Sequence, residues 1–327
     1  MNIEAPFGFV TGCHAGDRHL VVATLASIRQ YCPKVPICLT VDGDCDVSDL
    51  VRDYGVIVLR ISELSNKKLS KQIEKSFHAK QAAMWEGPFE FYVWLDSDAI
   101  LWGDITPQIN SELDFQIFWE GISIPKDAKE VPQWLLHYYF DPALLVKYDP
   151  TFEWRGNVYF SAGVYAARRG VFEIEKYLKL KSESEKQPKM FAFDDMGILN
   201  YLVHSYTQNG KIKSGYSDLQ HIPEHHGRKE FETDCLGHGW RFPEKIKRPR
   251  VAHFCGKKPF LYDFRSYSKP YTIARLQHHR LSHNILVAWL IIIIEDAKTL
   301  RNKVFKKITK YKSSRIFRKT PATFEVF

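Results

Sequence analysis

Two aspartates at the end of an apolar run have the residue types and spacing that most directly suggest chemistry. The run, residues 92–95, is aromatic and β-branched and follows a Gly-Pro pair, so it predicts a buried strand. Asp96 and Asp98 come next, separated by Ser97. Two carboxylates this close repel each other, and hard oxygen ligands at this spacing suit Mg²⁺ or Mn²⁺ that holds substrate phosphates. An isolated Asp-x-Asp fits an Asx-type turn equally well, so the stretch alone leaves both interpretations open.

The stretches before these aspartates alternate between strand and helix patterns. Apolar runs at residues 7–11, 35–41 and 56–61 predict strands, and periodic apolar positions at 17–28 and 47–54 predict helices. This order predicts an α/β fold with a mainly parallel sheet, flanking helices and right-handed crossovers. Ligands of such sheets bind beyond the carboxyl ends of the strands, where the two aspartates are expected.

Glycine-rich phosphate motifs are missing from the sequence. It contains neither G-x-G-x-x-G nor G-x-x-x-x-G-K-[ST], whose glycines bring the backbone close to phosphate. A standard dinucleotide fold and a P-loop are therefore disfavoured. Any bound phosphate must be held by metal and side chains.

Three later features could contribute to such a site. Lys80 lies in a helical pattern over residues 67–84, where the local sequence favours a solvated surface charge. Residues 159–167 form an apolar, strand-like run whose small residues permit close approach of a ligand. Asp194 and Asp195 open a helical pattern. Asp194 fits an N-cap, whereas capping does not require Asp195.

A histidine followed by glycine and two lysines is the last candidate segment. His253 follows a strand pattern at residues 250–252 and precedes Gly256, Lys257 and Lys258. An imidazole can bind a metal, and lysines can donate to phosphate. Taken alone, this segment is as ambiguous as the Asp-x-Asp.

Taken together, these motifs resemble those of the GT-A glycosyltransferases, most closely the family of glycogenin and the bacterial lipopolysaccharide galactosyl- and glucosyltransferases, glycosyltransferase family 8. The metal motif of that family is similar to residues 96–98 with Gly-Asp-Ile at 103–105. Its late His-x-x-Gly-x-x-Lys-Pro-Trp motif is similar to residues 253–260, which are one residue shorter and end in Phe260.

Two intermediate motifs agree in order with the same family. Residues 161–163 resemble its Asn-Ser-Gly strand, although Ser161 and Ala162 replace Asn and Ser. Residues 195–200 resemble its Asp-Gln-x-x-Leu-Asn helix start, with Met196 in place of Gln. The likeness extends over residues 7 to 265, which is most of the chain.

The resemblance implies metal-dependent transfer of a sugar from a nucleotide-sugar donor, expected to be a UDP-hexose, to a glycan, glycolipid or protein, with retention of configuration. Negative charge grows on the leaving diphosphate, which explains why a metal and lysines belong together. The role of Asp195 stays open, and a binding protein without turnover stays an alternative. The implied site residues are the Mn²⁺ or Mg²⁺ ligands Asp96, Asp98 and His253, the catalytic candidates Asp195 and Asp194, and the donor-binding residues Thr11, Gly12, Asp42, Lys80, Ser161, Gly163, Gly256, Lys257 and Lys258.

Composition supports a folded protein with a basic tail. Of its 327 residues 45% are hydrophobic, and the net charge is +8. Ten Lys or Arg against one Glu follow residue 297, so the tail carries about +9 and the remainder is near neutral. The six cysteines form no C-x-x-C pair and no secretory signal is visible, so a cytoplasmic protein is expected.

The last part of the chain predicts a separate helical segment, residues 281–327, after a catalytic domain at 1–280. Residues 285–294 are apolar, about half of what a transmembrane helix needs. Apolar residues then recur at helical spacing between lysines and arginines, which predicts docking of residues 285–320 on an anionic membrane surface. Packing on the catalytic domain with a solvated tail is the alternative. Nucleic-acid binding through Tyr311 and Phe317 is disfavoured, because no nucleic-acid module accompanies them.

Overall fold

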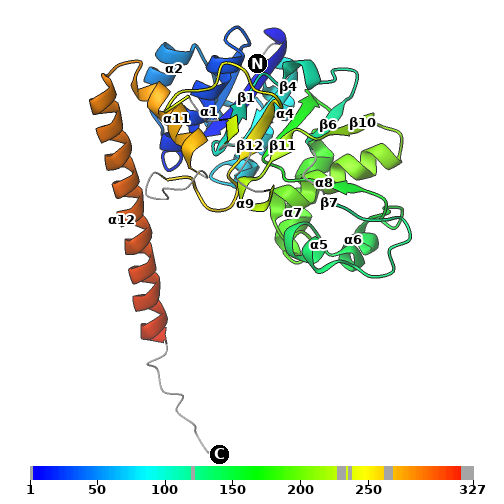
Figure 1. Ribbon diagram of the computed structural model, residues 1–327. Helices are drawn as coiled ribbons and strands as arrows, with labels where there is room; N and C mark the ends of the chain where they lie inside the picture. Colours follow the sequence, from blue (N-terminus) through cyan, green and yellow to red (C-terminus); the bar gives the residue numbers. More distant parts are fainter. Residues whose placement is uncertain (1–2, 119–121, 227–232, 235–237, 261–267, 318–327) are drawn as a thin grey trace, which may run out of the picture.

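The computed structural model describes residues 3–118, 122–226, 233–234, 238–260 and 268–317 (Figure 1). Its centre is a seven-stranded sheet with the order β10-β6-β9-β4-β1-β2-β3. The strands of this sheet are β1 (Ala5–Cys13), β2 (Ile37–Val41), β3 (Ile57–Arg60), β4 (Phe89–Leu95), β6 (Phe115–Phe118), β9 (Val164–Arg168) and β10 (Ser214–Ser217).

One half of the sheet is the parallel arrangement that the sequence predicts. β1 pairs in parallel with β2 and β4, and β2 with β3. The crossovers contain α1 (Arg18–Tyr31) and α2 (Ser48–Tyr54). β9 differs, because it lies antiparallel between β4 and β6. The sheet is therefore mixed but mainly parallel.

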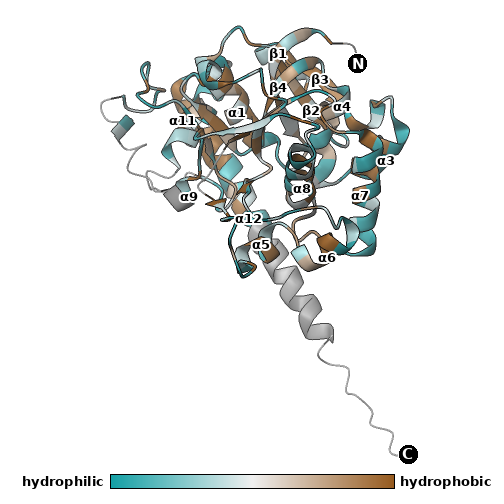
Figure 2. Ribbon diagram, turned by 90° about the vertical axis from the view of Figure 1, so that its right-hand side faces the viewer, coloured by the Kyte–Doolittle hydropathy of each residue, from teal (hydrophilic) through white to brown (hydrophobic). Residues whose placement is uncertain are grey.

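Successive side chains of the central strands pack alternately into two separate hydrophobic cores. Val10 and Trp94 belong to the cluster on one face of the sheet, whereas Phe9 and Val93 belong to the cluster on the other. This alternation follows from the two-residue period of a strand. Because both faces are covered, the strands read as continuous apolar runs. Figure 2 shows hydrophobic residues along the sheet and a largely hydrophilic outer helix α7 (Ile174–Lys186).

A smaller sheet extends the edge that carries the aspartates. β5 (Ala99–Trp102) pairs antiparallel with β12 (Arg250–His253), which pairs in parallel with β11 (Gln220–His221). The register sets His253 opposite Ala99. A third sheet joins β7 (Ile122–Ser123) to β8 (Val158–Tyr159). The single strand expected at residues 159–167 is thus wrong, since the chain turns between β8 and β9.

The continuous helix expected over residues 67–84 is also wrong. Lys75 has a left-handed backbone, with φ of 57°, and its N–H donates to Asp42 Oδ2 at 2.8 Å. Ser76 Oγ then accepts from the N–H of His78, which starts a new turn. The segment therefore divides into α3 (Lys67–Ile73), the 3-10 turn η2 (Phe77–Gln81) and α4 (Ala82–Glu86).

Most of the polar stretch at residues 182–189 is helical, because α7 continues to Lys186. Lys181 and Ser184 are buried on its inner face, and Lys181 pairs with Glu185 at 3.3 Å. The remaining described elements are the helices α5 (Gln133–Tyr138), α6 (Pro142–Tyr148), α8 (Asp194–Gln208), α9 (Pro223–His226), α11 (Lys269–His279) and α12 (Ile285–Phe317), and the 3-10 turns η1 (Ile61–Glu63) and η3 (Thr106–Gln108).

α12 combines the apolar and basic segments in one helix that extends away from the sheet (Figure 1). Its first turns pack on α11 through Ala288 and Ile292, which contact Leu276. Within the part of the chain that the structure describes, no helix is long and apolar enough to cross a membrane. Tyr311 and Phe317, named for nucleic-acid stacking, have side chains outside the described part.

Candidate active site

Asp96, Asp98 and His253 meet at the carboxyl edge of the sheet. One ligand atom of each lies within 4.8 Å of the other two. His253 Nε2 is 3.4 Å from Asp98 Oδ1 and 4.0 Å from Asp96 Oδ2. Two carboxylates and an imidazole are a donor set that Mn²⁺ accepts and that Mg²⁺ can share. The structure thus brings together the three residues that the sequence motifs linked.

The turn that carries the aspartates is held by backbone contacts. The N–H of Ala99 donates to the carbonyl of Asp96 at 2.9 Å, so a turn does follow β4. The carbonyl of Ser97 accepts from Thr24 Oγ1 at 3.0 Å and from the hydroxyl of Tyr271 at 2.9 Å. Because these contacts close the turn, both carboxylates remain available to other partners.

The partners of Asp96 come from its own strand and from β9. Its N–H donates to the carbonyl of Gly163 at 2.8 Å, and its Oδ1 accepts from Trp94 Nε1 at 2.7 Å. The indole contact was not predicted, because Trp94 reads as one more apolar residue of the strand. Its position two residues before Asp96, on the same face, is the only sequence signal for it.

Asp98 is buried between His253 and Lys258. Lys258 Nζ donates to Asp98 Oδ2, and His253 lies against Oδ1. Burial alone would raise the pKa of Asp98, but the hydrogen bond and charge of His253 and the charge of Lys258 outweigh it and hold this pKa well below its usual range. The N–H of Phe254 donates to the carbonyl of Asp98 at 3.0 Å, which fixes β12 against this turn.

Lys80 links the aspartate turn to α8. Its Nζ is 2.7 Å from Asp195 Oδ2 and 3.6 Å from Asp96 Oδ1, and 11% of its side chain is exposed. Burial would lower the pKa of Lys80, but the charges of Asp195 and Asp96 raise it above its ordinary value. Lys80 is therefore a largely buried cation, and its interpretation as a solvated charge is wrong.

The start of α8 is set by contacts with neighbouring loops. The helix begins at Asp194, with Phe193 in the N-cap position, so Asp194 is not the N-cap residue. The side chain of Asp194 lies outside the described part of the structure. Asn200 donates from Nδ2 to the carbonyl of Phe160 at 2.8 Å and accepts from its N–H at 3.2 Å. These bonds tie α8 to the segment that leads into β9.

Gly163 lies directly against the cluster. A Cβ added there would be 2.7 Å from both Asp96 Oδ2 and His253 Nε2. The N–H of Gly163 donates to Ser161 Oγ at 3.3 Å, which shapes the turn before β9. Only glycine leaves room between this backbone and the side chains of Asp96 and His253.

Three of the expected donor-binding residues lie at the ends of β1 and β2. Thr11 is fully buried, and a Cβ on Gly12 would be 3.1 Å from Cη2 of Trp94. Asp42 Oδ1 is buried and has no hydrogen-bond partner among the described atoms, although Oδ2 accepts from Lys75. Asp42 therefore offers an acceptor at this end of the site.

Glu224 is an acidic neighbour of the lysine segment that the sequence did not indicate. Its Oε2 accepts from the N–H of Lys257 at 3.1 Å, and a Cβ on Gly256 would collide with the same carboxylate. Glu224 lies in α9, within a loop region that carries no recognisable motif. The contact places the backbone of residues 256–257 beside α9.

The mixed sheet, its strand order and its flanking helices constitute a GT-A fold. The chain is similar to the galactosyltransferase LgtC in complex with donor and acceptor sugar analogs: identity is 14%, coverage is 84% of this chain and 95% of that chain, and the TM-score is 0.51. The glycosyltransferase GlyE of Streptococcus pneumoniae TIGR4 is 14% identical over 100% of this chain and 67% of that chain, with a TM-score of 0.49. At such identity the likeness to LgtC establishes the fold alone. No protein-family model and no curated protein matches the sequence.

Proposed function

We propose that the chain is a metal-dependent glycosyltransferase that moves a hexose from a UDP-sugar to a glycan, glycolipid or protein acceptor. The observation that carries this proposal is the cluster of Asp96, Asp98 and His253, with Lys258 beside it, at the carboxyl edge of a GT-A sheet. Retention of the anomeric configuration rests on the sequence resemblance to glycosyltransferase family 8.

Asp96, Asp98 and His253 would hold Mn²⁺ or Mg²⁺, because their oxygen and nitrogen atoms converge and Gly163 leaves space beside them. The bound ion would supply a Lewis acid that stabilises the charge of the leaving diphosphate. Trp94 and the backbone of Gly163 orient Asp96, and the register of β12 on β5 orients His253.

The lysines supply the positive charge that the diphosphate requires. Lys258 is 31% exposed at its side chain and already contacts Asp98, so its ammonium lies where phosphate oxygens would approach the metal ligands. Lys257 and Gly256 would also line the diphosphate site, through the backbone that Glu224 positions.

The sugar end of the donor would face the start of α8. Lys80 orients Asp195 toward Asp96, so the carboxylate of Asp195 is the first candidate for contact with the reacting sugar, with Asp194 beside it. Ser161 and Gly163 would line the same end. Thr11, Gly12 and Asp42 would lie along the nucleoside, where Asp42 Oδ1 offers a hydrogen-bond acceptor.

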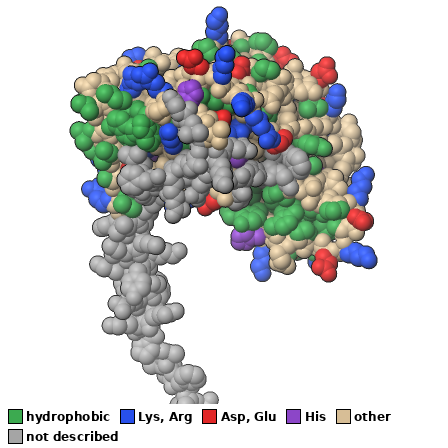
Figure 3. Space-filling view, viewed as in Figure 1, with side chains coloured by type: hydrophobic (Ala, Val, Ile, Leu, Met, Phe, Trp, Pro, Cys, Tyr) green, Lys and Arg blue, Asp and Glu red, His purple; other side chains and the backbone are tan. Residues whose placement is uncertain are grey.

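Residues 285–320 would dock the enzyme on an anionic membrane surface. Six aliphatic residues near the start of α12 are more than a third exposed, and Figure 3 shows apolar side chains gathered over this part of the molecule. These residues are Ile285, Leu286, Val287, Leu290, Ile293 and Ile294. An exposed apolar face on a helix rich in lysine is typical of interfacial helices. A glycolipid acceptor would suit this position.

The test is a screen of nucleotide sugars for Mn²⁺-dependent hydrolysis or transfer by the purified chain. The double variant Asp96→Asn, Asp98→Asn should lose activity by about 10²-fold or more, since it removes the charges that hold the stabilising ion. Asp127→Asn, an exposed aspartate elsewhere, is the control. Turnover that responds to Mn²⁺ as before in the double variant would reject the metal site. Donor binding without turnover would instead favour a binding protein.

A further inference from the structure

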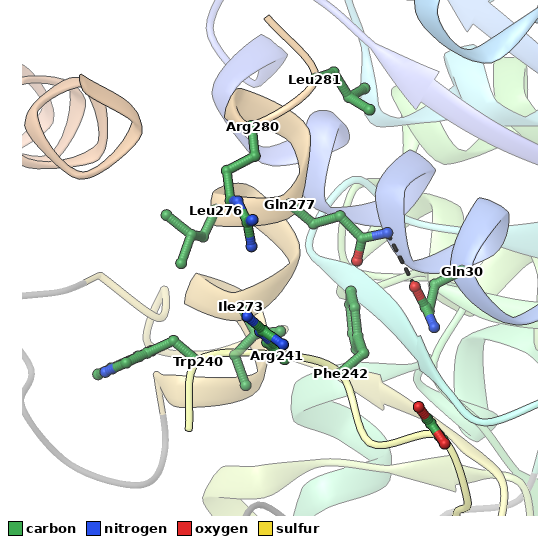
Figure 4. A pocket seen from close by; sticks show the side chains of 10 residues that line it. Gln30, Trp240, Arg241, Phe242, Ile273, Leu276, Gln277, Arg280 and Leu281 are labelled. Atoms are coloured by element: carbon green, nitrogen blue, oxygen red, sulfur yellow. Dashed lines mark hydrogen bonds between the residues drawn. The ribbon is translucent and has the colours of Figure 1, made fainter. Parts of the chain in front are cut away.

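A pocket of about 420 Å³ lies between the end of α1 and α11, and none of the residues that line it belongs to the aspartate cluster (Figure 4). Gln30, in the last turn of α1, is part of its wall, and a helix that follows a parallel strand ends at the far edge of the sheet. The other lining residues come from the loop before β12 and from α11: Trp240, Arg241, Phe242, Glu244, Ile273, Leu276, Gln277, Arg280 and Leu281.

The pocket has an apolar floor and an apolar rim. Phe242, Ile273 and Leu276 form the floor and are buried. Trp240 and Leu281 form the rim, with exposed fractions of 44% and 55%. An exposed tryptophan and an exposed leucine that line the same pocket are costly in water and favour an amphiphilic ligand.

Two arginines give the pocket a positive mouth. Figure 4 shows the side chain of Arg280 running along α11 toward the loop that carries Arg241. Neither guanidinium forms an ion pair with a residue that the structure describes, and Glu244 is the one acidic residue among those that line the pocket. The last turns of α1 and α11 also end here, and their carbonyls repel anions. An anion would therefore depend on Arg241 and Arg280.

The rim continues into the exposed face of α12. The ring of Trp240 meets Trp289 of α12 edge-on, with centroids 4.9 Å apart. Leu281 shortly precedes Ile285 and Leu286, which are 43% and 78% exposed. Tryptophans with adjacent aliphatic and arginine side chains are typical of a membrane interface, where phosphate groups meet acyl chains.

We propose that this pocket binds one anionic phospholipid, with Arg241 and Arg280 on the phosphate of the headgroup and the first acyl carbons on Trp240 and Leu281. The orientation of the pocket toward a bilayer rests on the proposed docking of α12. Recognition of the lipid does not depend on that docking, because binding of a single lipid molecule can be measured in solution. A free phosphate compound carries the same kind of negative charge as the lipid headgroup. The experiment therefore compares binding of the lipid with binding of a free anion.

The experiment is calorimetric titration of the full chain with dihexanoyl phosphatidylglycerol below its micelle concentration. Dihexanoyl phosphatidylcholine and glycerol phosphate are titrated in parallel. We expect binding of the anionic lipid to be at least tenfold tighter than that of the other two compounds. The double variant Arg241→Gln, Arg280→Gln should weaken it at least tenfold. The control Lys245→Gln, Lys247→Gln makes the same charge change outside the pocket and should alter it less than twofold.

Each other outcome overturns the proposal. Equal binding of phosphatidylcholine would show that the chains alone are recognised, and equal binding of glycerol phosphate would show a free-anion site. Equal losses in both variants would mean that general charge, and not the pocket, attracts the lipid. Metal-dependent donor turnover is measured on the same preparations, so failure of the glycosyltransferase proposal is seen separately.

Discussion

Gly163 sets the distance between the backbone of β9 and the ligand cluster. Its carbonyl accepts from the N–H of Asp96, and its Cα faces Asp96 Oδ2 and His253 Nε2. A side chain there would occupy the space between the ligands. The restriction is steric, since the position needs no left-handed backbone.

We expect Gly163→Ala to weaken Mn²⁺ binding by about tenfold or more, because the methyl group displaces Asp96 or His253 from the other ligands. Metal-dependent thermal stabilisation measures the effect independently of turnover. Gly170→Ala is the control: its φ is 75° and nothing lies within 4 Å of an added Cβ, so it strains the backbone without touching the cluster. Equal metal binding by both variants would contradict the role of Gly163.

The residues of this cluster could be named from the sequence because each has a chemically distinctive type at a strand or helix end. Asp96, Asp98 and His253 fall into that group. Glu224 does not, because its contact with Lys257 depends on how distant segments pack. The indole of Trp94 does not either, because Trp94 reads as one more apolar residue of its strand. Whether Lys80 was buried could not be read from its helix either, because Asp195 comes from a distant part of the chain.

At the scale of elements, α11 and α12 are joined by a buried ionic network. Arg275 is 1% exposed and donates to Asp296 Oδ1 and Glu295 Oε2, each at 2.7 Å. His279 Nε2 is 3.4 Å from the same oxygen of Glu295. Burial would raise the pKa of Glu295, but the hydrogen bonds and charges of His279 and Arg275 lower it to about 2. The network fixes the direction in which α12 leaves the domain.

Glu295→Gln should weaken this junction by about 2 kcal/mol at pH 7, as expected for a hydrogen bond to a buried charge. A carboxyl group whose pKa is lower in the folded state stabilises the fold at pH values above its unfolded pKa. The wild-type advantage should therefore fade as the pH falls from about 4.5 toward about 2. Hydrogen exchange of amides in the first turns of α12 measures the stability of this junction in both proteins. Glu183→Gln, at a surface pair with Lys186, should change little.

The elements with strong periodicity were predictable, and those set by distant contacts were not. The parallel strands β1 to β3 and their helices follow from continuous apolar runs and from apolar residues at helical spacing. The break at Lys75 did not follow, because its N–H donates to Asp42, which directly follows β2 and lies far away in the sequence. The antiparallel insertion of β9 between β4 and β6 also depends on pairing between segments far apart in sequence.

At the scale of the whole molecule, a buried histidine makes stability fall in mild acid. His204 lies among Tyr159 and Phe160, and burial lowers its pKa to about 4. The unfolded chain takes up a proton near pH 6.5, whereas the folded chain does so only near 4. Stability should therefore fall as the pH drops through this window, by up to about 3 kcal/mol from His204.

His204→Phe should flatten that decline, because it keeps an aromatic ring and removes the titrating group. Urea unfolding between pH 7 and 4.5 gives the slope of stability against pH. His283→Phe, at an exposed position, should leave the slope unchanged. A wild-type slope in the His204 variant would refute the assignment.

Membrane docking by α12 would involve the exposed leucines near its start. Leu286 and Leu290 are 78% and 56% exposed. Burying them in a bilayer would remove their apolar surface from water, which favours binding. Leu286→Ser with Leu290→Ser should weaken sedimentation with anionic vesicles at least tenfold. Val51→Ser with Val146→Ser removes exposed apolar side chains elsewhere and should have no effect. Equal binding by the two double variants would exclude α12 as the contact surface.

The pairing of β12 with β5 also has a consequence for the kinetics of folding. His253 reaches Asp96 and Asp98 only after β12, the last of the described strands in sequence order, has formed its antiparallel ladder with β5. Contacts between segments so far apart in sequence form slowly. A metal held by all three residues would bind the completed fold and not its partly folded precursors, and would stabilise it by mass action. The rate at which a refolding chain acquires metal affinity would therefore measure the closing of this ladder.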